Sequence, residues 1–358
     1  MSVARGPLAG IRIIELASIG PGPHAGMMLA DLGADVVRVQ RAQDRTAAAV
    51  QLRGRTIVEA DLKKPGDVAT VLDLIERADV LIEGFRPGVV ERLGVGPEEA
   101  LRRNPQLVYG RMTGWGQDGP RAQQAGHDIN YIGLTGALNA IGRKGDRPLP
   151  PINLLGDYGG GSVFLVLGIL AALLERERSG QGQVVDAAMV DGVMTLSHVF
   201  WSMSQVGMWS AERGTNLLDT GMAWYDTYST ADGKHMAVGA YEPQFYAELL
   251  RVLELDPESL PPQRDQGSQE VLRKVFTEKF ASKTQQEWTE LFDGVDACVT
   301  PVLTFAEAAD DAHLNARNAV VEVDGVRQPA PAPRFSRTPP PDPAPAPEVA
   351  TPIGEIWR

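Results

Sequence analysis

The sequence predicts an α/β fold in which a large Rossmann-like domain with a parallel sheet is followed by a smaller α+β domain. Three observations predict it. Short apolar runs alternate with helical segments through the first half of the chain. Near residue 224 the pattern changes to two short runs around a turn, followed by amphipathic helices. The length of 358 residues suits one large and one smaller domain, since a domain holds about 150 residues.

The elements of the first half follow from the apolar runs. We expect strands at 11–16, 35–39, 56–58, 80–82 and 107–110, with helices at 24–32 and 66–77. These βα units predict the Rossmann-like opening. The glycine run 159–161 introduces a helix over 162–178, whose nearly continuous apolar face implies burial. Residues 185–208 resemble a long apolar helix that needs a covering neighbour.

In the second half, strands are expected at 225–228 and 235–238 and helices at 243–254, 269–281 and 284–293. The stretch 329–352 holds 10 of the 26 prolines, so we expect an extended segment that packs at least as far as Phe335. The expected organisation is a large Rossmann-like domain (1–186), a linker with the long helix (187–223), a small α+β domain (224–310) and a return linker with the proline-rich segment packing on the large domain (311–358).

Composition narrows the function. The formal net charge of −12 argues against a general electrostatic affinity for nucleic acid or anionic membranes. Cys298 is the single cysteine, so no intramolecular disulfide is expected, and its flanks suggest a buried residue; this fits a reducing cytoplasm, where we expect the protein. Residues 1–5 lead into Gly-Pro without the apolar run of a secretion signal, and no window approaches the ~20 apolar residues of a membrane span.

The loop at 20–26 resembles a dinucleotide-binding turn only loosely. Its spacing is G-x-G-x-x-x-G, and Pro21 and Pro23 lack amide hydrogens that would bind pyrophosphate. The second strand ends at Gln40-Arg41 where an NAD site would place an acid, which favours a ribose carrying a phosphate, as in CoA. Further basic residues lie near predicted strands, although each alone is typical of a solvated surface: Arg53, Arg55, Lys63, Lys64, Arg86 and Arg92.

Two residues are candidates for acid–base chemistry. His127 lies where a loop enters a helix with Asp128 as the expected N-cap, and Asp157 precedes the long apolar helix. A structural loop histidine and a helix N-cap remain alternatives for His127 and Asp157 respectively. The histidines show no metal-ligand spacing and the chain has no G-x-S-x-G motif, so we expect neither a metal site nor a serine hydrolase.

Five segments resemble the family of class III CoA-transferases and α-methylacyl-CoA racemases. They are LAGIRIIEL (8–16), DLGADVVRV (31–39), ADLK (60–63), DVLIEGFRPG (79–88) and GQVVD (182–186). Within the family, AGHDINY (125–131) and NLLGDYGGG (153–161) are similar to the racemase branch. The transferase branch keeps an aspartate that aligns with Asp157, as an acyl-accepting nucleophile, but lacks the histidine. The resemblance therefore makes His127 the discriminating residue.

The resemblance implies an interlocked homodimer whose active site lies between the large domain of one subunit and the small domain of the other. It implies a racemase that acts without cofactor or metal, in which His127 and Asp157 transfer the α-proton on opposite faces of an enolate. The N–H of Asp128 would stabilise the thioester oxygen, and Glu242 of the other subunit would orient His127. Taken alone, Glu242 also fits a carboxylate at a helix N-terminus.

The resemblance also assigns contacts to the CoA thioester. Arg41 would bind the adenosine phosphate end, and two groups of residues would surround the rest of the substrate. Those expected at the nucleotide and pantetheine are Ala60, Asp61, Leu62, Lys63, Gly84, Phe85, Arg86 and Arg92, and those at the thioester are Gly126, His127, Asp128, Ile129, Asn130 and Tyr131.

A methionine-containing surface is expected to hold the acyl group, because a flexible apolar wall lets it move as the α-carbon inverts. Its residues would be Met194, Met203, Met208 and Met222. Two alternatives stay open: a CoA-transferase that uses Asp157 as nucleophile, and a CoA-ester binding protein without catalysis.

Overall fold

The computed structural model describes residues 5–42, 44 and 49–357; residues 1–4, on which part of the secretion-signal argument rests, lie outside the described residues. The chain forms two compact units. The large unit comprises Met1–Thr135, Pro151–His198 and Ala312–Arg358, and the small unit comprises Gly136–Pro150 and Val199–Asp311. The sequence-based boundaries differ from these units at 136–150, which the sequence assigns to the large domain, and at 187–223, an expected linker that the two units share.

The large unit is built on a six-stranded sheet in which all strands are parallel. Its order is β3-β2-β1-β4-β5-β6, the doubly wound order of Rossmann folds. The expected α/β fold with a parallel sheet is therefore confirmed. The strands are β1 (Arg12–Leu16), β2 (Asp35–Gln40), β3 (Arg55–Glu59), β4 (Val80–Glu83), β5 (Val108–Thr113) and β6 (Val184–Ala188).

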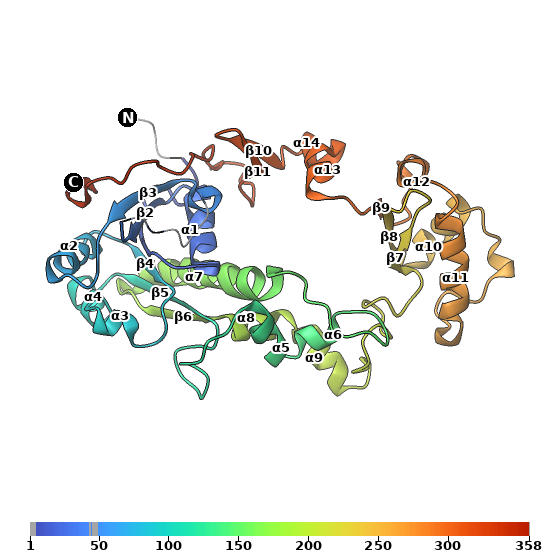
Figure 1. Cartoon of the computed structure of the whole chain (residues 1–358), viewed down its shortest axis with the longest axis horizontal. Coiled ribbons are helices and arrows are strands. Elements are labelled where there is room, and N and C mark those ends of the chain that lie inside the picture. Colours follow the sequence, from blue (N-terminus) through green and yellow to red (C-terminus); the bar gives the residue numbers. More distant parts are fainter. Residues whose placement is uncertain (1–4, 43, 45–48, 358) are drawn as a thin grey trace. The chain divides into compact units, whose positions relative to one another are not determined.

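Helices cover both faces of this sheet (Figure 1). On one face, α1 (Pro21–Asp31) and α7 (Val163–Ser179) bury apolar side chains such as Leu29 and Ile169 against the strands. On the other, the core includes residues of α2 (Pro65–Ile75), α3 (Val89–Arg92) and α4 (Pro97–Arg103). The sheet is thus packed between two helical layers. Because all its strands are parallel, the loops that follow them meet at one edge.

The expected long helix over 185–208 is wrong. The segment begins with edge strand β6, continues as α8 (Met189–Leu196) and then as α9 (His198–Gln205). A short apolar run has no periodicity that separates a buried strand from a helix. Here pairing with β5 decides the conformation of its first four residues.

The helix expected from 162 begins earlier. A π-helix, Leu154–Ser162, runs directly into α7, so the glycine run lies inside a helix. The glycines allow a close crossing with α8, because a Cβ at Gly160 would lie 2.8 Å from the Val193 nitrogen and one at Gly192 would lie 1.9 Å from the Gly160 oxygen. By length and composition alone, the continuous helix Leu154–Ser179 could cross a membrane; residues including Leu165 and Ile169 instead pack in the core of the large unit.

Arg53 and Arg55 belong to buried ion pairs rather than to a solvated surface. Glu15 pairs with Arg38 and, at 3.2 Å, with Arg55. Arg53 binds both carboxylate oxygens of Asp31 at 2.6 and 3.0 Å. These pairs tie together β1, β2 and the N-terminal end of β3.

The proline-rich segment follows α14 (Ala312–Ala316) and the hairpin β10 (Val320–Val323) and β11 (Val326–Pro329). It contacts the large unit well beyond Phe335. The Thr351 N–H donates to the Ile57 carbonyl at 2.7 Å, and the Trp357 indole donates to Asp35 at 2.7 Å. The last described residues thus complete the large unit.

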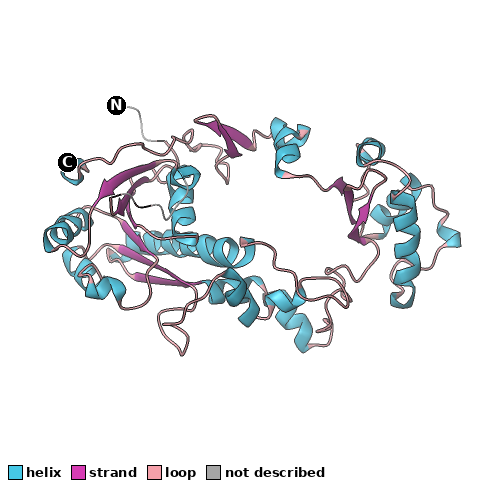
Figure 2. Cartoon of the chain, viewed as in Figure 1, coloured by secondary structure: helices cyan, strands magenta, loops and turns pink. Residues whose placement is uncertain are grey.

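The small unit packs three antiparallel strands against helices (Figure 2). Aromatic residues including Trp224, Phe276 and Trp288 fill its core. Residues 136–150 belong to it because Arg143 pairs with buried Asp226 at 2.9 Å. Besides most of α9, its helices and strands are α6 (Ala137–Ala140), β7 (Tyr225–Ser229), β8 (His235–Gly239), α10 (Pro243–Val252), α11 (Gln269–Phe280), α12 (Gln285–Phe292), β9 (Val299–Pro301) and α13 (Phe305–Asp310).

Candidate active site

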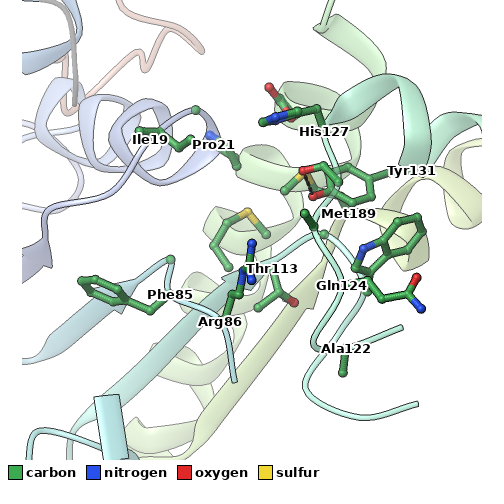
Figure 3. Close-up of a pocket in the computed structure, with 18 of the residues that line it drawn as sticks. Ile19, Pro21, Phe85, Arg86, Thr113, Ala122, Gln124, His127, Tyr131 and Met189 are labelled. Carbon is green, nitrogen blue, oxygen red and sulfur yellow. Dashed lines mark hydrogen bonds between the residues drawn. The ribbon is translucent and has the colours of Figure 1, made fainter. Parts of the chain in front are cut away.

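A cavity of about 320 Å³ opens at the carboxyl edge of the parallel sheet. Segments that follow β1, β4, β5 and β6 line it, and β1 and β4 are neighbours on either side of the point where the strand order reverses. Ligands of doubly wound sheets bind at this point. Figure 3 shows Arg86 extending from the loop after β4 toward the side on which His127 and Tyr131 lie.

His127 borders this cavity immediately before α5 (Asp128–Leu134). Its backbone N–H donates to Asn130 Oδ1 at 3.0 Å, and its carbonyl accepts the Asn130 N–H at 2.8 Å. Its side chain is exposed. Asn130, expected at the thioester, therefore fixes the backbone that carries the imidazole.

Tyr131 supports the same segment from within the cavity wall. Its hydroxyl donates to the Gly126 carbonyl at 2.5 Å, and its ring meets Trp115 edge-on at 4.7 Å. Side chains at two glycines would displace the ring, since a Cβ at Gly114 would lie 2.1 Å from it and one at Gly126 would lie 2.8 Å from it. Burial raises the pKa of the Tyr131 hydroxyl, so it stays a proton donor at neutral pH.

Asp157 lies on the first turn of the π-helix and lines the cavity with His127. Partial burial raises the pKa of its carboxyl group, and the Asp128 carboxylate raises it further. A hydrogen bond from the Asn153 amide at 3.0 Å and the nearby His127 oppose this rise. Gly20 approaches closely, since a Cβ there would lie 3.5 Å from the Asp157 carboxylate.

The sequence predicts Asp128 as the N-cap of its helix, which is wrong. Asp128 is the first residue of α5, and His127 is the N-cap. Its buried carboxylate reaches the start of the π-helix, where Oδ2 accepts the N–H groups of Gly156 at 2.7 Å and Asp157 at 2.8 Å. Among the described residues, neither its Oδ1 nor its own N–H has a hydrogen-bond partner.

The loop after β4 is held by a residue that the sequence analysis missed. Glu83 is fully buried at the end of this strand, accepts the Phe85 N–H at 2.7 Å and accepts Arg111 Nε at 2.8 Å. Burial raises the pKa of Glu83. The sequence could have indicated this role, because an acidic residue directly follows the apolar run Val-Leu-Ile at the end of the predicted strand.

The structure brings together only part of the expected substrate contacts. Those that line the cavity are Gly84, Phe85, Arg86, Gly126, His127, Tyr131 and Asp157. Ile129 and Asn130 instead line a neighbouring, more open cavity of about 480 Å³. Arg92 lies on α3 beside Gly88, away from the cavity lining.

The remaining contacts follow β2 and β3 along the same edge of the sheet. Arg41 and Lys63 are exposed there, whereas Ala60 is buried and donates its N–H to the Gln40 carbonyl. The Asp61 carboxylate accepts the Lys63 N–H at 3.1 Å and so shapes the turn before α2, next to half-buried Leu62. Within the described chain, no carboxylate pairs with the four exposed cations Arg41, Lys63, Arg86 and Arg92.

Three expectations concern the small unit. Glu242 is exposed and lies at the N-cap of α10. Cys298 is exposed rather than buried, whereas the neighbouring Ala297 is fully buried. Burial and the charges of Asp296 and Glu242 raise the pKa of its thiol. Met222 is buried in the core, so it is unavailable to an acyl group; Met208 is exposed and Met203 half-buried, and Met194 is exposed on the large unit.

Comparisons with known proteins agree over nearly the whole chain. The family model "CoA-transferase family III" matches residues 8–351. Mouse alpha-methylacyl-CoA racemase is 49% identical over 98% of this chain and 92% of its own length, and the human racemase is 47% identical over 93% and 87%. The crystal structure of a CaiB/BaiF family protein from Brucella suis superposes with a TM-score of 0.85 at 25% identity, covering 96% of this chain and 97% of the other.

Proposed function

Because the chain belongs to CoA-transferase family III, we propose that it is an α-methylacyl-CoA racemase, which interconverts (R)- and (S)-2-methylacyl-CoA thioesters. The observation that carries this proposal is that His127 and Asp157, two different acid–base groups, line one cavity. Racemisation requires one group to remove the α-proton and another to return a proton to the opposite face.

The proton balance closes without any other reactant. In one direction neutral His127 takes the α-proton, the enolate forms, and protonated Asp157 donates a proton to the opposite face. In the other direction ionised Asp157 takes the proton and His127 in its charged form donates. The raised pKa of Asp157 supports the first direction, because it keeps the carboxyl group protonated closer to neutral pH. The reaction therefore needs no cofactor or metal.

The enolate oxygen needs a hydrogen-bond donor, because charge develops on it in the transition state. We assign this role to the backbone N–H of Asp128. It follows His127 directly and has no acceptor among the described residues.

CoA would lie along the carboxyl edge of the sheet, with its phosphates near the exposed, unpaired cations. Arg41 and Lys63 follow β2 and β3, and Arg86 follows β4. No carboxylate of the described residues pairs with these side chains, so the negatively charged phosphates of CoA can bind them. An acyl-CoA is therefore a better match than an uncharged substrate, even though the chain as a whole is acidic.

An interlocked homodimer is part of the proposal. One side of α7 exposes Val163, Leu167 and Leu174, spaced at four and seven residues and therefore on one face. Monomeric proteins rarely leave such a stripe uncovered. In this dimer Glu242 of the partner subunit would orient His127.

Subunit complementation tests the dimer proposal. A chain with His127→Ala co-expressed with a chain carrying Glu242→Gln would form mixed dimers with one intact site. We expect about a quarter of wild-type activity from equal, random mixing of two chains in a two-fold dimer. Activity no greater than that of the separate variants would contradict a shared site.

The function itself is tested by solvent exchange. Incubation of a pure (R)-2-methylacyl-CoA in deuterium oxide should give α-deuterated (R) and (S) products. Retained configuration without deuterium uptake would refute the racemase. A CoA-transferase would instead acylate Asp157, and hydroxylamine would trap that acyl-enzyme during turnover.

A further inference from the structure

The Asp128 side chain joins the two segments that carry the acid–base groups. Its Oδ2 accepts the Gly156 and Asp157 N–H groups at 2.7 and 2.8 Å, while its backbone continues directly from His127. The α5 segment and the π-helix are distant in sequence, and the Asp128 side chain joins them in space. One carboxylate therefore connects the backbone of one acid–base residue to the backbone of the other.

Holding two N–H groups does not require a charge. An asparagine oxygen accepts two hydrogen bonds equally well, and a buried carboxylate costs more to desolvate than an amide. The Asp128 side chain is nevertheless ionisable and only 6% exposed, and its Oδ1 has no partner in the described part of the chain. No ion pair among the described residues involves Asp128, so a negative charge on it would act on neighbouring groups.

The group that this charge acts on is Asp157. Two adjacent carboxylates disfavour double ionisation, so a proton is retained on one of them. The other polar groups around Asp157 are His127, the Asn153 amide and Tyr131. Gly20, at the N-cap of α1, brings no side chain toward it, and His24 of α1 is hydrogen-bonded to Ser162 at 2.7 Å. Among these groups only Asp128 presents a second carboxylate to Asp157.

We propose that the Asp128 carboxylate is a positioning residue, which sets the distance between His127 and Asp157 and keeps the proton on Asp157. This inference rests on the proposed racemase function and adds a role for the Asp128 side chain, distinct from that of its N–H.

Asp128→Asn separates the positioning effect of Asp128 from the effect of its charge. The variant keeps an acceptor for both N–H groups but removes the charge. We expect this variant to fold and to bind CoA as the wild type does. The acid limb of its kcat/KM against pH should move to lower pH, since Asp157 then loses its proton more readily. Asp191→Asn is the matched control, because Asp191 lies exposed in the first turn of α8. It should leave the profile unchanged.

Gly156→Ala perturbs the same link from the other side, since its Cβ would lie 2.4 Å from Asp128 Oδ2. We expect Asp128→Ala and Gly156→Ala each to lower kcat by about 10²-fold, the cost of misplacing catalytic groups by roughly 1 Å. KM should change little. The double variant should lose much less than the product of the two losses, because both changes break one link.

Three results would overturn the proposal: an unchanged pH profile in Asp128→Asn, wild-type kcat in folded Asp128→Ala, or multiplicative losses in the double variant. A direct measurement does not depend on activity. The carboxyl ¹³C shift of Asp157, identified by its loss in Asp157→Asn, should titrate at lower pH in Asp128→Asn. Should the wild type show no α-proton exchange, the racemase function fails, while this titration still decides the effect of the Asp128 charge.

Discussion

Removing the Tyr131 hydroxyl would test how the imidazole segment is held. Tyr131→Phe deletes one oxygen and keeps the ring between Gly114, Gly126 and Trp115. The lost hydrogen bond joins the hydroxyl to the Gly126 carbonyl at 2.5 Å, one residue before His127. Such a bond contributes about 0.5–1.5 kcal/mol net. Gly126 borders the cavity, so water can partly replace the lost donor and the expected cost lies near the middle of this range.

The loss should appear in catalysis, because the Gly126 carbonyl fixes the peptide that precedes His127. If the whole free energy is spent in positioning the imidazole, kcat/KM falls by about two- to tenfold, at roughly 1.4 kcal/mol per factor of ten. The fall should be in kcat, because the Tyr131 ring stays in place against the substrate cavity. The assay is the initial rate of α-hydrogen exchange, with thermal unfolding measured in parallel.

Two other tyrosines provide matched controls. Tyr109 is fully buried and donates to the Val95 carbonyl at 2.9 Å, so Tyr109→Phe should cost about 1–3 kcal/mol of stability but leave kcat unchanged. The Tyr246 hydroxyl is buried without a partner among the described residues, so Tyr246→Phe should be neutral or stabilising. Wild-type kcat in Tyr131→Phe, or an equal loss in all three variants, would refute the reasoning.

The remaining predictions concern three variants. Arg53→Met leaves Asp31 buried without its partner, which should cost about 3–5 kcal/mol and lower Tm by roughly 6–20 °C; an unchanged Tm in a thermal scan would contradict the buried pairing. Asp157→Asn should lower exchange by about 10²–10⁴-fold. Burial raises the folded-state pKa of Asp157, so ionisation of this carboxyl group destabilises the fold as pH rises through that value. Asp157→Asn should therefore have a higher Tm than the wild type at pH 8 but not near pH 4. A lower Tm of the variant at pH 8 would disprove the destabilising effect of this ionisation. Leu167→Glu on the exposed side of α7 should produce monomers by light scattering, whereas Glu177→Lys beyond this stripe should not.

The parallel sheet could be predicted because its strands are apolar runs of the right length, bounded by helices. The expected segments at β1 to β5 were correct to within a few residues. β6 could not be predicted in the same way, because its run Val-Val-Asp-Ala-Ala continues without a break into α8. Its strand conformation depends on pairing with Tyr109 to Thr113, far away in sequence. Such pairing overrides local preference.

The sequence predicted the acid–base residues of the site, but not the hydrogen bonds that position them. His127 and Asp157 were candidates from their places in the sequence, the family resemblance assigned their roles, and the structure brings both to one cavity. The supporting contacts of Asp128, Tyr131 and Glu83 join residues 28, 5 and 28 positions apart, respectively. Only the second is local in sequence. Contacts between distant segments leave no periodic signal in a single sequence.

The return of the chain to the large unit has a consequence for synthesis. Ile356 fills the core beside α2, and Arg53 donates to the Gln328 side chain and the Pro329 carbonyl, more than 270 residues later. On a ribosome, part of the core of the large unit therefore stays open until Ile356 has emerged. Most of the small unit, 199–311, is complete before then. The small unit can thus fold first although it lies in the second half of the chain, and a prematurely ended chain would expose the face of the sheet that the C-terminus covers.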